Sequence, residues 1–165
     1  MELVHALAGA WPTYLSFTLS FGSVLIMWLN HHAIFKFAQR VTNRLMFTNG
    51  LLLCLTTLVP FATGFLALHL VGVGGHVAAA VYAGLFLFIN VSYNLLWQSI
   101  NSQSRSHERE SVRRQITRTY LVGFAGYSAA LLIATWSAFA TIVICVLLWG
   151  LWATHVRGVH DRGAR

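Results

Sequence analysis

Residues 45–104 read LMFTNGLLLCLTTLVPFATGFLALHLVGVGGHVAAAVYAGLFLFINVSYNLLWQSINSQS and contain no Lys, Arg, Asp or Glu. A membrane-spanning helix needs about 20 predominantly apolar residues. A single span across the whole stretch would be far too long, whereas two spans joined by a turn fit it. The segment VGVGGH at residues 71–76 is the expected turn, because glycine favours tight changes of chain direction. The stretch therefore predicts a helical hairpin in a membrane.

All eleven Lys and Arg side chains fall into clusters that bound this run and two further charge-free runs, residues 3–35 and 119–156. Cytoplasmic loops of membrane proteins carry an excess of Lys and Arg, and five spans place every cluster on one side. We therefore expect a multi-pass protein of the cell membrane with its N-terminus outside and its C-terminus in the cytoplasm. The clusters are Lys36, Arg40 and Arg44; Arg105, Arg109, Arg113, Arg114 and Arg118; and Arg157, Arg162 and Arg165.

The expected fold is all-α: a polytopic membrane protein with five transmembrane helices in a single membrane domain, residues 1–165. Composition agrees, since 57% hydrophobic and 9% charged residues leave too little polar surface for a soluble domain. The net charge of +7 would suggest nucleic acid in a soluble protein, but the bias toward cytoplasmic basic loops accounts for it. We expect contact with the lipid bilayer and none with nucleic acid. The expected spans are about 11–30, 46–68, 77–99, 116–135 and 138–156.

Three of these spans have polar side chains along one edge, at helical spacings of three and four residues. Such edges either form hydrogen bonds between helices or line an aqueous path. None of them carries a charge, which favours helix packing. The edges are Ser16, Ser20, Ser23 and Asn30/His31 in the first span; Asn49, Thr56, Pro60 and Thr63 in the second; and Asn90, Asn94, Trp97 and Asn101 in the third.

His31 and His32 are neighbours at the end of the first expected span. Adjacent residues on a helix point about 100° apart, so the pair is poorly arranged to chelate one metal ion. We expect no metal and no other cofactor. Three roles stay open for the pair: a hydrogen bond between helices, a pH-sensing contact, and solvation at the membrane interface.

Enzyme chemistry has little support in this sequence. The acidic side chains all lie outside the expected spans, so no carboxylate is available there as a general base or ion ligand. Neither a Gly-x-Ser-x-Gly motif nor a phosphate-binding loop is present. We therefore expect neither an enzyme nor a proton-coupled transporter. The acids are Glu2, Glu108, Glu110 and Asp161.

The most specific landmark in the first half of the chain is the string Trp28-Leu29-Asn30-His31-His32, followed by Asn49. Together with other landmarks nearby, it resembles the prokaryotic transmembrane protein 175 family of potassium channels. The resemblance implies a potassium-selective channel subunit that assembles as a homotetramer and mediates passive flux of potassium ions. It also implies an interhelical polar network of Trp28, Asn30, His31, His32 and Asn49. The other landmarks are Trp11-Pro12, Arg44-Leu45 and Val59-Pro60-Phe61.

Members of that family have six spans, and their first helix carries an Arg-x-x-x-Phe-Ser-Asp motif and lines the pore. This sequence has no such motif, so its five expected spans resemble family spans two to six. We expect the chain by itself to conduct potassium poorly. A non-conducting accessory or interaction protein on the same scaffold is the alternative, and a small-solute transporter is a third, less favoured reading.

Overall fold

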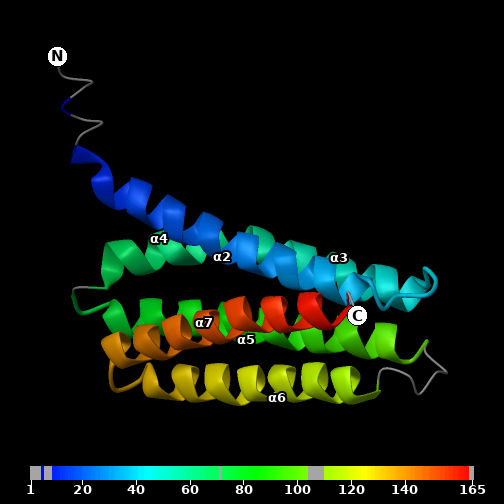
Figure 1. Cartoon of the computed structure of the whole chain (residues 1–165). Coiled ribbons are helices and arrows are strands. Elements are labelled where there is room, and N and C mark those ends of the chain that lie inside the picture. Colours follow the sequence, from blue (N-terminus) through cyan, green and yellow to red (C-terminus); the bar gives the residue numbers. More distant parts are fainter. Residues whose placement is uncertain (1–4, 6–8, 71, 104–109, 164–165) are drawn as a thin grey trace.

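A computed structural model of the protein describes residues 5, 9–70, 72–103 and 110–163. All regular structure within these residues is helical, as predicted. Figure 1 shows the helices side by side along one common direction, with α5 and α7 between α6 and the layer of α2, α3 and α4. The helices are α2 (Trp11–Phe35), α3 (Asn43–Thr57), α4 (Val59–His69), α5 (Gly75–Asn101), α6 (Glu110–Ile133) and α7 (Ala138–Gly163).

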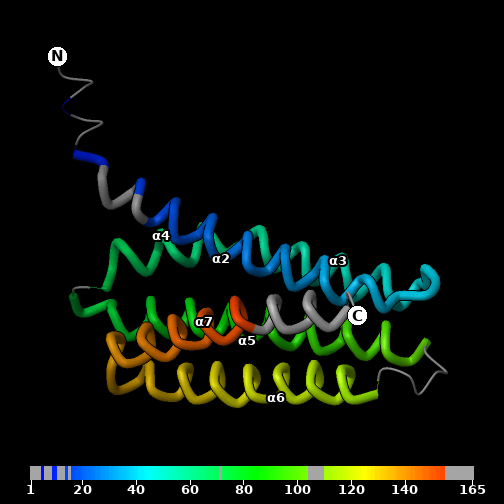
Figure 2. The backbone as a smooth tube through the Cα atoms, in the orientation of Figure 1, coloured from blue at the N-terminus to red at the C-terminus, as the bar shows by residue number. Residues whose placement is uncertain are grey.

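The five expected ranges coincide with helical stretches, with α3 and α4 together filling the second range. The fourth range, 116–135, extends two residues past the end of α6 at Ile133. The chain turns there and Ser137 caps α7, its hydroxyl oxygen accepting the N–H of Ala140 at 3.2 Å. Figure 2 traces the backbone from one end of the bundle to the other and back.

Three helical stretches in the described part are long and apolar enough to cross a membrane: Asn43–His69, Gly75–Asn101 and Glu110–Ile133. Ala138–Thr154 is a shorter apolar helix. Helix α2 has a polar edge made of Ser16, Ser20, Ser23, Asn30 and His31. A helix of that kind needs protein neighbours along its polar edge.

The second span is broken at Leu58, between α3 and α4. Pro60 lies in the first turn of α4; it has no N–H to donate, and its ring would collide with a carbonyl one turn earlier in a continuous helix. The N–H of Leu58 instead bonds to the carbonyl of Leu55 at 3.1 Å. Pro60 therefore accounts for the break between the two helices.

The two ends of the bundle differ in charge and in how their connections are held. At one end the side-chain oxygen of Gln103 accepts the N–H groups of Gln39 and Arg40, at 3.1 and 3.0 Å, which joins the α2–α3 connector to the end of α5. At the other end His76 donates from Nδ1 to the carbonyl of Ala134 at 2.9 Å. The described members of the first two basic clusters thus lie at one end. Arg105, Arg109 and Arg165 lie outside the described residues.

Helix α5 occupies the centre and packs against α3, α4, α6 and α7. Its fully buried side chains include Phe86, Leu96 and Ile100. Two glycines of α6 permit close approach: a Cβ on Gly123 would lie 2.4 Å from Nδ2 of Asn90, and one on Gly126 would lie 2.8 Å from a methyl group of Leu148. Close contact through small residues is typical of membrane helices.

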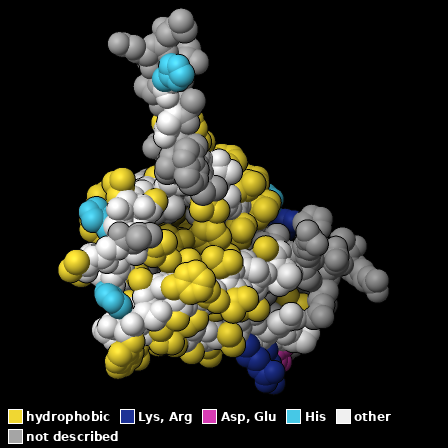
Figure 3. Space-filling model, turned by 90° about the vertical axis from the view of Figure 1, so that its left-hand side faces the viewer, with side chains coloured by type: hydrophobic (Ala, Val, Ile, Leu, Met, Phe, Trp, Pro, Cys, Tyr) yellow, Lys and Arg dark blue, Asp and Glu magenta, His cyan; other side chains and the backbone are white. Residues whose placement is uncertain are grey.

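Large apolar side chains cover the outside of the bundle. Phe47 is 80% exposed and Leu68 is 81% exposed. Figure 3 views the end with the α4–α5 and α6–α7 turns, where hydrophobic side chains dominate and Lys and Arg show only at the margins. A bilayer accommodates such a surface, whereas water does not. Cys54 belongs to this outer surface: it is exposed and does not pack inside the bundle, as an apolar cysteine in a span would be expected to.

Candidate functional site

A short hydrogen bond joins α2 to α3 near the basic end of the bundle. Nε2 of His31 lies 2.6 Å from Oδ1 of Asn49. An amide oxygen only accepts, so the histidine donates. The His31 ring also packs against Phe35, with ring centroids 4.4 Å apart. The connector between the helices reverses the chain and brings these two half-buried side chains together. Each belongs to a polar edge for which the sequence favoured contacts between helices.

Trp28 and His32 lie on the opposite, outer side of α2. Their rings stack at 5.7 Å with an interplanar angle of 17°, and Trp28 is 58% exposed. No hydrogen bond joins either side chain to another helix within the described residues. Phe17 and Phe21 stack on each other at 6.4 Å, and both side chains are exposed. Of the five residues implied by the resemblance, the structure therefore brings His31 and Asn49 together and leaves Trp28 and His32 facing outward.

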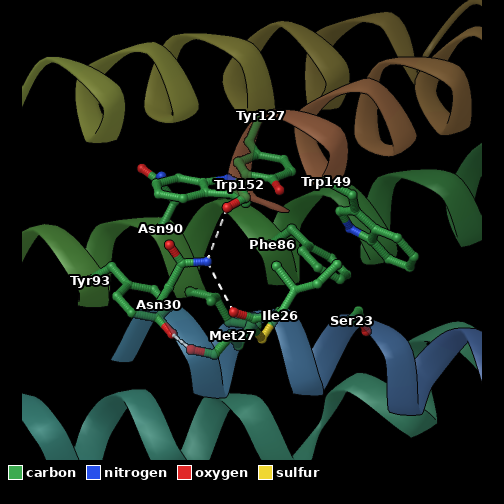
Figure 4. A pocket seen from close by; sticks show the side chains of 11 residues that line it. Ser23, Ile26, Met27, Asn30, Phe86, Asn90, Tyr93, Tyr127, Trp149 and Trp152 are labelled. Atoms are coloured by element: carbon green, nitrogen blue, oxygen red, sulfur yellow. Dashed lines mark hydrogen bonds between the residues drawn. The ribbon is translucent and has the colours of Figure 1, made fainter. Parts of the chain in front are cut away.

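Asn30, the fifth of these residues, points into the bundle and is only 4% exposed. Its amide nitrogen donates to the carbonyl of Ile26 at 2.9 Å and to that of Trp152 on α7 at 3.4 Å, as Figure 4 shows. Close by, the hydroxyl of Tyr93 on α5 donates to the carbonyl of Met27 at 2.5 Å. Helix α2 is thus tied to α3, α5 and α7 within one turn.

Sequence reasoning missed Tyr93 and Trp152. In the bonds just described, a tyrosine hydroxyl donates to a backbone carbonyl and a backbone carbonyl accepts from an asparagine. Every residue has a carbonyl, so such contacts leave no pattern of residue types to detect. The only available signal was that buried Tyr and Trp usually find a hydrogen-bond partner, which gives no partner's position.

The serine and asparagine edges lie largely inside the bundle, but their polar atoms bond locally. Ser20 and Ser23 are each 2% exposed, and their hydroxyls donate to the carbonyls of Ser16 and Ser20, both at 2.8 Å. Asn94 donates to the carbonyl of buried Asn90 at 3.1 Å and to its side-chain oxygen at 3.2 Å. Ser16 and Asn94 are half-buried. These bonds stay within single helices.

A small cavity of about 30 Å³ lies between α2, α5, α6 and α7. Figure 4 shows aromatic side chains from three helices closing around it. A water molecule needs about 10–15 Å³ in a comparable measure, so there is room for about two. A conducting path needs a continuous series of ion positions, and this cavity does not provide one. Its aromatic lining consists of Phe86, Tyr93, Tyr127, Trp149 and Trp152.

Comparisons with known proteins agree with this architecture. Residues 1–60, which include His31 and Asn49, match the family described as endosomal/lysosomal potassium channel TMEM175. A potassium channel of Chamaesiphon minutus is 39% identical over 149 residues, which are 88% of this chain and 73% of that protein. A potassium channel of Streptomyces collinus is 41% identical over 96 residues, 58% of this chain and 47% of that protein.

The fold also matches a solved structure. The crystal structure of a lysosomal potassium-selective channel TMEM175 homolog from Chamaesiphon minutus superposes with a TM-score of 0.79 at 37% sequence identity. The match covers 93% of this chain and 79% of that one. The two proteins therefore share their helix arrangement over the matched residues.

Proposed function

Because the chain belongs to the TMEM175 family of potassium channels, we propose that it is a subunit of a potassium-selective channel that mediates passive potassium flux across a membrane. The observation that carries the proposal is the match to a potassium-selective channel over 93% of the chain at 37% identity. The apolar helices and the exposed apolar surface suit the membrane location of that family.

The closed interior of the bundle bears on where the ions pass. Aromatic rings fill the space between α2, α5 and α7, and the cavity left there holds about two water molecules. The ion path therefore lies between subunits, around an axis shared by several copies. We propose a homotetramer, in which the exposed outer sides of α2 and α3, with Phe17, Trp28 and Phe47, face the pore-lining helix or a neighbouring subunit.

We place the protein in the cell membrane. In the proposed orientation its N-terminus is outside the cell and its C-terminus is in the cytoplasm. The basic connectors joined through Gln103 support it, since basic loops prefer the cytoplasm. A reporter that works only in the cytoplasm, inserted at Gly75, is expected to be inactive, and the same reporter after Gln103 is expected to be active. The reverse pattern would overturn the orientation.

Flux in liposomes tests the channel function. We compare the 165-residue chain with an extended chain, defined as the same residues preceded by the pore-lining first helix of a family member. The extended chain is expected to give a potassium flux well above its sodium flux, and the 165-residue chain little of either. Selective flux through the 165-residue chain would place a path along the helices described above. A folded extended chain without flux would favour the accessory protein.

A further inference from the structure

A groove opens at the basic end of α6, where the helix meets the last turn of α5. Three guanidinium groups and one carboxylate line it, so positive charge is in excess. The groove measures about 420 Å³ and is open to the outside. Its lining residues are Asn101, Glu110, Arg113, Arg114, Thr117 and Arg118.

The arginines of the groove differ in how they are held. Nη1 of Arg113 donates to Oδ1 of Asn101 at 2.7 Å, which fixes this guanidinium against the end of α5. Arg114 pairs with Glu110 at 2.5 Å, but both side chains are more than half exposed, and such surface pairs are weak. Arg118 makes no hydrogen bond or ion pair with any described residue. Arg114 and Arg118 are four residues apart and lie on one side of the helix.

The same side of α6 continues as an apolar stripe. Leu121 is 57% exposed and Val122 is 55% exposed, one turn beyond Arg118, and Leu132 further along is 66% exposed. A soluble anion would use only the charged groove. An anionic group attached to an acyl chain would use the groove and the stripe together. The groove lies at the interface end of α6, and the stripe runs from there along the helix toward the membrane interior.

We propose that this groove binds the phosphate group of an anionic phospholipid in the leaflet at the basic end of the bundle. Arg118 and Arg114 contact the phosphate, Arg113 with Asn101 forms the wall of the groove on the α5 side, and an acyl chain packs along Leu121 and Val122. The tendency of basic residues to lie on one side of a membrane explains the number of arginines there. It does not explain a groove that continues into an exposed apolar stripe.

Binding is measured on the purified 165-residue chain in neutral detergent, by the number of retained lipids in native mass spectrometry and by the thermal unfolding midpoint. Phosphatidylglycerol is expected to bind and to raise the midpoint more than phosphatidylcholine does. Arg118→Gln should weaken phosphatidylglycerol binding about fivefold, which corresponds to about 1 kcal/mol for one basic residue at an anionic surface. Arg118→Lys should keep part of the affinity.

Arg44→Gln is the matched control, since Arg44 is an exposed arginine in the first turn of α3, outside the groove. It should bind phosphatidylglycerol as the unchanged chain does. Equal binding of the two lipids, or equal losses in Arg118→Gln and Arg44→Gln, would overturn the proposal. Inorganic phosphate and glycerol phosphate at millimolar concentration should leave the midpoint unchanged. If either reproduces the effect of phosphatidylglycerol, the groove is a site for soluble anions and the lipid assignment is wrong.

Discussion

Helices α5 and α2 belong to one bundle, yet their surroundings differ. Several neighbouring helices contact α5, and its buried residues recur at spacings of mostly three or four from Gly75 to Ile100. Helix α2 buries Ser20, Ser23 and Asn30 along one side and exposes aromatic rings along the other. This chain therefore supplies most of the packing of α5, apart from exposed positions such as Val77 and Phe88, whereas the outer side of α2 needs lipid or another subunit. Substitutions around α5 should act on stability, and those on the outer side of α2 on assembly and flux.

The largest expected effect comes from Gly123→Ala, at the contact between α6 and α5. The new methyl group would lie 2.4 Å from Nδ2 of Asn90 and 2.8 Å from Cζ2 of Trp152. Overpacking of this kind typically costs about 1–3 kcal/mol. The unfolding free energy in detergent is the measurement.

Gly64→Ala on α4 is the matched control, since a Cβ there meets nothing within 4 Å. It should be neutral or gain up to about 1 kcal/mol, because alanine is a better helix former than glycine. Equal stability of the two alanine variants would show that α5 and α6 are less tightly packed than described.

A smaller loss is expected from Trp97→Phe, at a second contact between α5 and α6. Nε1 of buried Trp97 donates to the hydroxyl of Thr117 at 2.9 Å, and the indole ring meets Phe37 edge-on at 5.7 Å. Phenylalanine keeps most of the ring but loses the hydrogen bond, worth about 1 kcal/mol. Thr117→Val removes the same bond from the other side. The double variant should lose less stability than the sum of the single variants, and full additivity would contradict the bond.

The inner side of α2 is tested by a double-mutant cycle on His31 and Asn49. Asn49→Leu and His31→Phe each remove the 2.6 Å hydrogen bond between α2 and α3, so their coupling energy should be about 0.6–1 kcal/mol. Thr48→Val is the control, because the Thr48 hydroxyl donates only to carbonyls of its own helix, at 2.9 and 3.1 Å. A coupling energy near zero would mean that the pair does not hold the two helices together.

Much of the fold could be predicted from the sequence because a bilayer imposes strong constraints on it. Long charge-free runs between basic clusters give the number and positions of the helices, and Pro60 gives the break near Leu58. The end of α6 was misplaced because Ala134 and Thr135 are as compatible with a membrane helix as the residues before them. The signal that would have corrected it is Ser137, a helix-capping residue.

The candidate site was less predictable, since the spacing of residues on one helix does not specify its neighbours. The polar edges indicated that Asn30, His31 and Asn49 belong inside the bundle, but not that Asn30 reaches α7 while His31 reaches α3. The close approach of Gly123 to Asn90 leaves no mark in the sequence beyond a glycine in a helix. Such pairings depend on how helices rotate and tilt against each other, which hydropathy does not report.

The smallest effect on stability is expected from Trp28→Ala on the outer side of α2. Trp28 is 58% exposed and contacts His32 of its own helix through ring stacking. Removing an exposed side chain usually changes the unfolding free energy by no more than about 0.5 kcal/mol. If this side of α2 faces a pore helix or a second subunit, however, the potassium flux of the extended chain should fall although its stability does not. Leu68→Ala, at an 81% exposed position on α4, is the control and should alter neither quantity. Unchanged flux in both variants would indicate that the outer side of α2 faces lipid, and the contrast between α2 and α5 would then reflect the bilayer alone.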